Sequence, residues 1–213
     1  DTNFGNYFGK MYQPRYLSGL AAGAMTESNK IGYVAAFPIP EVIRGINAFA
    51  TGVKEVNPDA TVEVVWTFTW FGPEAETQAA NALLETGVDV LAQHQDSPST
   101  GIAAEAAGAK WISYNTAYGQ DAAPGAFVTA PVWDWGPYYV DVVESIINDE
   151  FVAEAYWGGM ETGLVSLYEL TSDVPSETAS LISDRTEEII SGSFDPPIVE
   201  EEFIDNVIGT VNP

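Results

Sequence analysis

The chain has 213 residues, which is enough for one large domain or two small ones around a sizeable core. Cysteine is absent, which excludes disulfides, thiolate metal sites and a cysteine nucleophile, and the 46% hydrophobic content excludes a disordered chain. With 31 Asp and Glu against 7 Lys and Arg, the net charge of -24 repels nucleic acids and anionic membrane surfaces.

The acidic residues are scattered along the chain, whereas lysine occurs only at Lys10, Lys30, Lys54 and Lys110. This pattern favours a halophilic protein, in which concentrated salt screens the self-repulsion, over an ordinary acidic surface. No apolar run reaches the roughly 18 residues that a membrane-spanning helix needs. The opening residues lack the basic and apolar regions of a signal peptide, so a leader was either removed or never present.

Helical and strand patterns alternate between residues 12 and 115. The expected helices, which have apolar residues at helical spacing, are 12–25, 41–56, 74–85 and 100–107. The expected strands, which are nearly continuous apolar runs, are 30–37, 61–70, 88–95 and 111–115. Such alternation predicts an α/β fold with a parallel, doubly wound sheet and right-handed crossovers.

The two ends of the chain are harder to assign. Residues 1–10 are polar and rich in glycine and asparagine, which indicates an irregular lead-in, and the composition of 116–126 is typical of a linker. The acidic tail 193–213 stays unassigned. The other expected elements are a strand at 126–132, a helix at 134–148, a turn at 156–160, a strand at 164–170 and a helix at 175–191.

The sequence contains no recognisable catalytic or cofactor motif. Its single histidine, His94, excludes a histidine metal pair and any acid–base work shared between two histidines. A phosphate-binding lysine loop, a Gly-x-Gly-x-x-Gly run after a strand and a Gly-x-Ser-x-Gly elbow are all missing. We therefore expect no metal, no cofactor and no catalytic residue.

Four of the expected strands end in polar or aromatic side chains. The carboxyl ends of parallel strands meet at one edge of a sheet, where ligands bind in open α/β folds. Aromatic faces can stack there on a flat polar ring, while amides and carboxylates bind the edge of the ring through hydrogen bonds. The candidate ligand-binding residues are Phe37, Trp70, Phe71, Gln95, Asp96 and Asn115.

Most of these candidates also have a purely structural interpretation. Phe37 and Trp70 are more typical of core residues than of a ligand platform. Asp96 could cap the helix that follows it, and Asn115 could belong to a turn. A histidine such as His94, flanked by two glutamines, more often has a structural role than a ligand-binding one.

Four long stretches resemble one known family. They are Tyr-Phe-Gly-Lys-Met-Tyr-Gln-Pro-Arg-Tyr-Leu-Ser-Gly at 7–19, the run at 30–49 that opens Lys-Ile-Gly-Tyr-Val, Val-Leu-Ala-Gln-His-Gln-Asp-Ser-Pro at 90–98 and Thr-Ala-Pro-Val-Trp-Asp-Trp-Gly-Pro-Tyr-Tyr at 129–139. Over nearly all of residues 5–195 the chain resembles the basic membrane protein family, the substrate-binding lipoproteins of ABC importers that include purine nucleoside receptors. The resemblance implies a type I periplasmic-binding-protein fold, in which two α/β lobes close over a ligand.

The resemblance also implies which parts of that fold are present, namely one complete lobe plus part of a second. Residues 5–120 match the second, C-terminal lobe, and 121–155 match a hinge return and part of the first lobe. Residues 156–213 then hold a hinge strand, the C-terminal helix and the acidic tail. Since most of the first lobe is missing from this match, we expect weak or no ligand binding by this chain alone.

The ligand class is implied by the same resemblance. Phe37, Trp70, Asp96 and Asn115 match positions where the second lobe meets the ligand. The motifs around Trp70 and Asp96 resemble those of a subgroup that binds purine bases. Purine bases and nucleosides are therefore the expected ligands.

Three positions depart from the pattern of the family. Trp133, which on its own is as typical of a core or hinge residue as of a stacking one, falls where nucleoside-binding members carry lysine. This departure favours a free base over a nucleoside. The subgroup usually has Asn and Asp where this chain has Phe68 and Gly72, which predicts a shifted loop after the second strand.

The implied function is that of the extracytoplasmic solute-binding component of an ABC importer, lipid-anchored at the extracellular face of the cell membrane. Its implied partners are a permease, an ATPase and the solute, with no nucleic acid. One alternative is a nucleoside-processing enzyme that uses Asp96 as acid or base with assistance from His94. Another is a non-binding relic that self-associates through the exposed face between the lobes.

Overall fold

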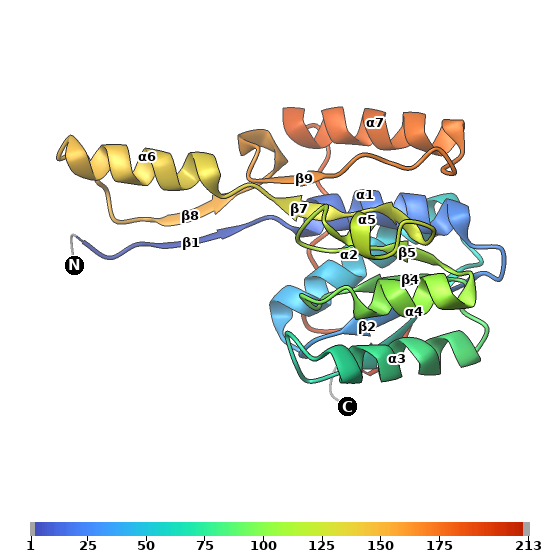
Figure 1. The fold of residues 1–213 in the computed structure, drawn as a ribbon. Coiled ribbons are helices and arrows are strands. Elements are labelled where there is room, and N and C mark those ends of the chain that lie inside the picture. Colours follow the sequence, from blue (N-terminus) through green and yellow to red (C-terminus); the bar gives the residue numbers. More distant parts are fainter. Residues whose placement is uncertain (1–2, 211–213) are drawn as a thin grey trace.

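The computed structural model describes residues 3–210, which form an α/β body with an arm that extends from it (Figure 1). The arm consists of β1, β8 and α6. Residues 1–2 and 211–213, at the ends of the predicted lead-in and tail, lie outside the described residues. In chain order the elements are β1 (Asn6–Gly9), α1 (Tyr12–Met25), β2 (Lys30–Ala35), α2 (Pro40–Val56), β3 (Thr61–Trp66), α3 (Pro73–Glu85), β4 (Val90–Gln93), α4 (Ser99–Ala107), β5 (Lys110–Ile112), α5 (Gly119–Ala122), β6 (Phe127–Thr129), β7 (Pro131–Trp133), α6 (Gly136–Ile147), β8 (Ala155–Gly158), the 3-10 helix η1 (Met160–Thr162), β9 (Val165–Leu167), α7 (Ser176–Ser191) and β10 (Val207–Ile208).

The body is built on a parallel sheet with the strand order β10-β3-β2-β4-β5-β6. Neighbouring residues of β2 pack into different cores: Tyr33 lies with residues of α1 and α2, and Val34 lies with residues of α3 and α4. Because the central strands are buried on both faces, they have to be apolar throughout, and this is the pattern that the sequence shows. The predicted α/β fold with a parallel, doubly wound sheet is confirmed.

The order of the strands opens a crevice at one edge of this sheet. From β2 the chain crosses through α2 to β3 on one side, and from β4 it crosses through α4 to β5 on the other side. Since these crossovers diverge, the space outside the carboxyl ends of β2 and β4 is not filled by a connection. The residues that follow these two strands therefore line the crevice.

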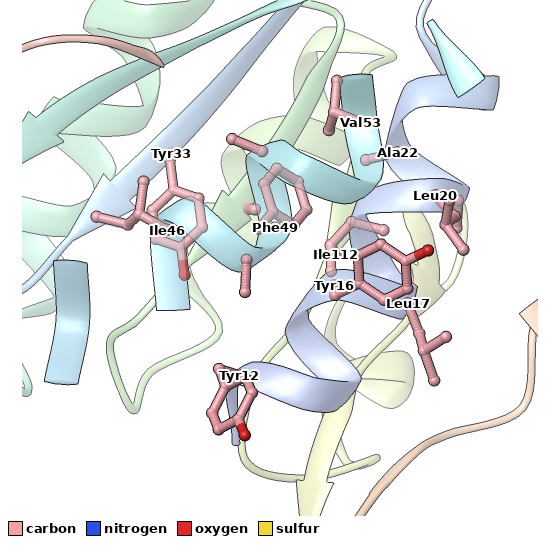
Figure 2. Packing of buried hydrophobic residues seen from close by; sticks show 14 of the residues in the cluster. Tyr12, Tyr16, Leu17, Leu20, Ala22, Tyr33, Ile46, Phe49, Val53 and Ile112 are labelled. Carbon is pink, nitrogen blue, oxygen red and sulfur yellow. The ribbon is translucent and has the colours of Figure 1, made fainter. Parts of the chain in front are cut away.

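Helices α1 and α2 pack together with their backbones in close contact. A Cβ atom on Gly19 would lie 2.0 Å from the carbonyl oxygen of Phe49, and one on Gly52 would lie 2.1 Å from that of Tyr16. Figure 2 shows the apolar side chains that fill the space around this contact, with Leu17 and Leu20 on α1 and Phe49 on α2. The absence of a side chain at these glycines allows the two helices to form one layer of the core.

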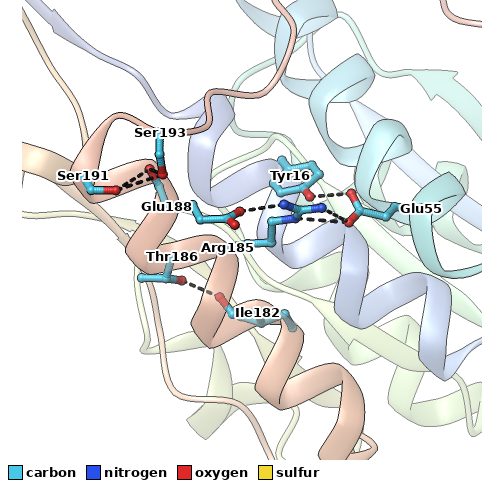
Figure 3. A network of polar contacts seen from close by, with 8 residues as sticks. All are labelled: Tyr16, Glu55, Ile182, Arg185, Thr186, Glu188, Ser191 and Ser193. Atoms are coloured by element: carbon cyan, nitrogen blue, oxygen red, sulfur yellow. Dashed lines mark hydrogen bonds and ion pairs between the residues drawn. The ribbon is translucent and has the colours of Figure 1, made fainter.

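Most of the few cations tie distant segments together. Arg185 on α7 lies 2.7 Å from Glu55 on α2 and 2.6 Å from Glu188, and Tyr16 donates to the other Glu55 oxygen at 2.5 Å (Figure 3). Lys54 contacts Asp205 at 2.5 Å, and Arg44 pairs with Glu200. These contacts fix α7 and the C-terminal segment to α2.

In the arm, β1 pairs in parallel with β8, and α6 packs along this pair (Figure 1). The ring centroid of Tyr7 lies 4.9 Å from that of Tyr138, which in turn lies 4.4 Å from the ring centroid of Tyr156. An open groove of about 1160 Å³ runs along this aromatic seam. No residue of α6 is buried, and the exposed apolar side chains of this helix include Val140, Val143, Ile146 and Ile147.

Several predicted elements need correction where pairing partners lie far along the chain. The segment Asn6–Gly9, predicted as irregular, is a strand, and so is Ala155–Gly158, where we predicted a turn. The tail likewise holds a short strand, β10, that pairs with β3. None of the three has a strong strand pattern in its own sequence. Each forms a strand because it pairs with a segment that lies far along the chain. The domain boundaries implied by the resemblance stay a prediction.

Other corrections concern boundaries. The strand predicted at 61–70 ends at Trp66, because the backbone of Phe68 turns into the left-handed region with φ 55. The strand predicted at 126–132 is two strands, β6 and β7, which pair with β5 and β9 respectively. The predicted linker contains the helix Gly119–Ala122.

Replacing Gly52 with alanine tests the contact between α1 and α2. We expect Gly52→Ala to lower the free energy of unfolding by at least about 1–3 kcal/mol, since the new methyl group meets rigid backbone. Gly45→Ala in the same helix is the control, because its Cβ would have only ordinary contacts, the nearest at 3.7 Å. That control should be neutral or stabilise by up to about 1 kcal/mol. Equal effects in urea denaturation would contradict the proposed contact.

The charge balance predicts that salt stabilises the folded chain. Raising KCl from about 0.1 to 1 M shortens the Debye length from about 10 to 3 Å, which weakens the repulsion among the excess carboxylates more than the few ion pairs. The midpoint of thermal unfolding should therefore rise with salt, and Glu85→Lys should raise it at low salt while reducing its salt dependence. A midpoint that falls with added KCl would show that the ion pairs dominate.

Candidate functional site

An aromatic surface lies where β2 and β3 end. Phe37, after β2, is half-buried, and its ring centroid lies 5.2 Å from that of Trp70. Trp70 is 43% exposed and Phe71 is 65% exposed. The ring of Phe68 also meets that of Phe37, edge to face, at a centroid distance of 6.4 Å. The sequence therefore placed Phe37 and Trp70 together correctly, and the exposed ring of Trp70 can accept a flat ligand.

The aromatic loop is held in a strained conformation. Phe68 adopts φ 55, which is costly for a bulky side chain by about 1–3 kcal/mol. The subgroup that the chain resembles usually carries asparagine at this position, and asparagine tolerates such a backbone better than phenylalanine does. Strain of this kind is concentrated at ligand sites and persists only where the surrounding structure enforces it.

A chain of hydrogen bonds links Asp96, Asn115 and Trp133. The indole nitrogen of Trp133 donates to Asn115 Oδ1 at 2.8 Å, and Asn115 Nδ2 donates to Asp96 Oδ1. Asn115 has φ 65, a left-handed conformation that asparagine adopts readily. Its amide is thus oriented by Trp133, and the exposed carboxylate of Asp96 keeps its second oxygen for another donor.

Trp133 belongs to a stack of rings rather than to an open platform. Its ring lies parallel to that of Trp135 with a centroid distance of 4.9 Å, and Phe8 meets it edge-on at 5.5 Å. Through Phe8 the stack reaches strand β1 of the arm. Trp133 therefore joins the crevice of the body to the arm.

Gln95 lies behind the surface of the crevice. Its side chain is fully buried and donates to Thr67 Oγ1 at 2.7 Å. The structure thus brings Phe37, Trp70, Asp96 and Asn115 to the crevice, whereas Gln95 connects the loops from below. A direct contact between Gln95 and a ligand stays a prediction.

A buried polar cluster supports the crevice from inside the body. His94 is 2% exposed; its Nε2 lies 3.2 Å from Glu41 and its ring centroid 4.7 Å from that of Tyr114. Arg15 is fully buried, donates to the backbone oxygen of Gln93 at 2.8 Å and lies 3.7 Å over the Tyr114 ring. Sequence analysis missed Arg15, although an arginine within an apolar helix was a usable signal.

Burial controls the protonation of this cluster. It lowers the pKa of His94 below 6.5, although the carboxylate of Glu41 favours the charged imidazole. Burial also opposes charge on Glu41, but His94, Arg15 and Arg44 outweigh it and lower the pKa of that carboxyl. The pair is therefore a neutral imidazole whose Nε2 lies 3.2 Å from a carboxylate oxygen of Glu41. The burial of His94 and its contact with Glu41 favour the structural interpretation of this residue.

Two further properties bear on function. Within residues 3–210, no group of three or more His, Cys, Asp or Glu side chains is arranged to hold a metal ion. The helices of this part of the chain include none that is both long and apolar enough to cross a membrane.

The fold and the crevice together define the class of protein: the chain has the type I periplasmic-binding-protein fold. A solute-binding protein of an ABC transporter system from Conexibacter woesei superimposes with a TM-score of 0.75 at 24% identity, covering 93% of this chain and 67% of that chain. One from Aeropyrum pernix gives a TM-score of 0.80 at 16% identity over 94% and 68%. At these identities the likeness establishes the fold, which confirms the predicted fold class.

The family follows from the sequence comparisons. The family described as ABC transporter substrate-binding protein PnrA-like (Bmp) matches residues 1–197, and the chain belongs to this family. A putative ABC transporter glucose-binding protein of Haloferax volcanii is 46% identical over 193 residues, 91% of this chain and 49% of the relative. A purine-binding protein of Brucella abortus is 36% identical over 91% of this chain and 55% of the relative. The chain thus spans about half the length of the curated relatives it matches.

The single histidine makes the buried pair directly measurable. We expect the imidazole of His94 to titrate below 6.5 by NMR. Because its pKa is lower in the folded than in the unfolded state, the unfolded chain binds more protons, and the free energy of unfolding falls as the pH drops from about 7 toward the folded pKa. His94→Gln should flatten this slope above pH about 5, where carboxylates stay ionised. A folded pKa above 6.5 would instead indicate a charged pair with Glu41.

Proposed function

We propose that this chain supplies one wall of the solute site in the extracytoplasmic binding protein of an ABC importer, and that the solute is a purine base. The observation that carries this proposal is the fixed juxtaposition of Trp70 and Asp96. The backbone N–H of Asp96 donates to the carbonyl oxygen of Trp70 at 2.9 Å, which holds the backbones that carry an exposed ring and a carboxylate next to each other. A heteroaromatic ring can stack on Trp70 while its ring N–H or exocyclic amine donates to Asp96.

The state of Trp133 supports a free base over a nucleoside. Its indole N–H is used by Asn115, and one face of its ring is covered by Trp135. A ribose needs polar partners for its hydroxyls, and Trp133 offers none at this position. The remaining free groups, an oxygen of Asp96 and a second N–H of Asn115, suit the donor and acceptor pair along the edge of a purine.

A hexose is the second candidate. The relative from Haloferax volcanii is named as a putative glucose-binding protein, and its identity to this chain is higher than that of the purine-binding relative. An aromatic face beside a carboxylate also fits a pyranose, whose C–H face packs on a ring while its hydroxyls donate to Asp96. The two candidates differ in the ligand, not in the residues that bind it.

The enzyme alternative has less support. His94, the assistant that it requires, points its Nε2 at Glu41 rather than into the crevice. Asp96 forms its side-chain hydrogen bond with Asn115, a residue that cannot take part in proton transfer. The family is one of substrate-binding proteins. Its implied partners, a permease and an ATPase, form part of this proposal, as does a location of the binding protein at the extracellular face of the membrane. The other alternative, self-association through the exposed face between the lobes, stays a prediction.

Saturation-transfer NMR on the 213-residue chain tests the proposal, since it detects weak binding. With adenine, adenosine and glucose as probes, we expect saturation of the adenine ring protons. Trp70→Ala and Asp96→Asn should each weaken binding by about tenfold or more, because they remove the stacking face and the charged acceptor. Phe4→Ala, an exposed aromatic in the arm, should have no effect. Saturation of glucose alone would favour the hexose, and no difference among the variants would contradict the assignment of the site.

A further inference from the structure

A buried carboxylate that the site described so far does not use lies directly beneath the crevice. Glu76, in the first turn of α3, is 0% exposed. Among the described residues no lysine, arginine or histidine forms an ion pair with it. Burying a carboxylate without a cation is costly, and the position at the amino end of a helix offsets only part of that cost. Its hydrogen bonds therefore have to account for its presence.

The two oxygens of Glu76 bind two different loops. Oε1 accepts from the backbone N–H of Gly72 at 2.8 Å, and Oε2 accepts from the hydroxyl of Ser97. Gly72 closes the loop that carries Trp70, and Ser97 follows Asp96 directly. Two donors thus converge on one side chain, and a carboxylate is the group that can accept at both ends.

Other contacts show that the two loops form one unit. The Asp96 N–H donates to the Trp70 oxygen at 2.9 Å, and Gln95 donates to Thr67 at 2.7 Å. The acidic loop is also shaped from below, since Gln93 Nε2 donates to the backbone oxygens of Gln95 at 2.9 Å and Ser97 at 2.7 Å. Glu76 lies at the point where this unit meets helix α3.

We propose that Glu76 is a positioning residue, a buried clamp that holds the Trp70 loop and the Asp96 loop at a fixed separation. The separation decides how a ring stacked on Trp70 presents its edge to Asp96, so that the clamp tunes which solutes fit. The binding part of this inference rests on the proposed function. The clamp itself concerns only the chain, and it can be tested without a ligand.

Amide hydrogen exchange provides that test. The reporter is the Asp96 N–H, which donates to Trp70 and makes no direct contact with Glu76. Glu76→Ala should raise the exchange rate of this amide at least about tenfold beyond the change at core amides such as those of β4. Glu76→Gln keeps one acceptor and should restore part of the protection. Glu74→Ala is the matched control, since Glu74 is exposed in the same helical turn, and it should change nothing. Equal changes at Asp96 and in β4 would overturn the clamp, because they would show only a loss of global stability.

Ligand measurements on the same variants separate the two proposals. If the unsubstituted chain binds adenine, Glu76→Ala should lose about tenfold or more of the affinity while Glu74→Ala keeps it. Unchanged binding in a variant with a loosened Asp96 amide would overturn the positioning role. If the unsubstituted chain binds none of the probes, the proposed function fails, and amide exchange alone decides the clamp. Should Glu76→Ala fail to fold, Ser97→Ala removes one of the two bonds and should still speed exchange at Asp96.

Discussion

The burial of β2 and β4 on both faces is the constraint on which the rest of this structure depends. Helices have to cover both sides, and the crossovers from these two strands run in opposite directions. The helix layer on one face of the sheet is possible only because Gly19 and Gly52 let the backbones of α1 and α2 approach each other closely. The same arrangement leaves the carboxyl ends of the two strands uncovered, and this is the edge where open α/β folds bind their ligands.

The crevice shows how hydrogen bonds can be distributed so that few groups remain for a ligand. Asn115 is oriented by Trp133, and Gln95 is used by Thr67. Behind the surface, His94 lies against Glu41, and Arg15 donates to the backbone oxygen of Gln93 and lies over the Tyr114 ring. As a result, the exposed carboxylate of Asp96 is the main polar group that stays free at the crevice.

Charge is used sparingly and over long distances. In a chain with 7 cations, Lys10, Lys54, Lys110 and Arg185 each contact a carboxylate on a segment distant in sequence. Such contacts contribute modestly one by one, but those of Lys54 and Arg185 help the C-terminal segment and α7 to dock on α2. The excess of acid, in turn, makes solvent salt part of the energetics of the whole molecule.

The sequence by itself determined the class of fold and predicted the candidate residues of the site. Apolar runs such as Ile31–Ala36 and the helical spacing in 41–56 are local patterns, and their alternation predicts a parallel sheet whose strand ends converge on Phe37, Trp70, Asp96 and Asn115. Only the tertiary structure decided which of these side chains remain free. The strand at Asn6–Gly9 exists because of a partner at the other end of the chain. The burial of Gln95 and the role of Glu76 likewise depend on loops that meet only after folding. The physical reason is that periodicity records which way a residue faces, whereas hydrogen-bond partners between distant segments leave no mark in the local pattern.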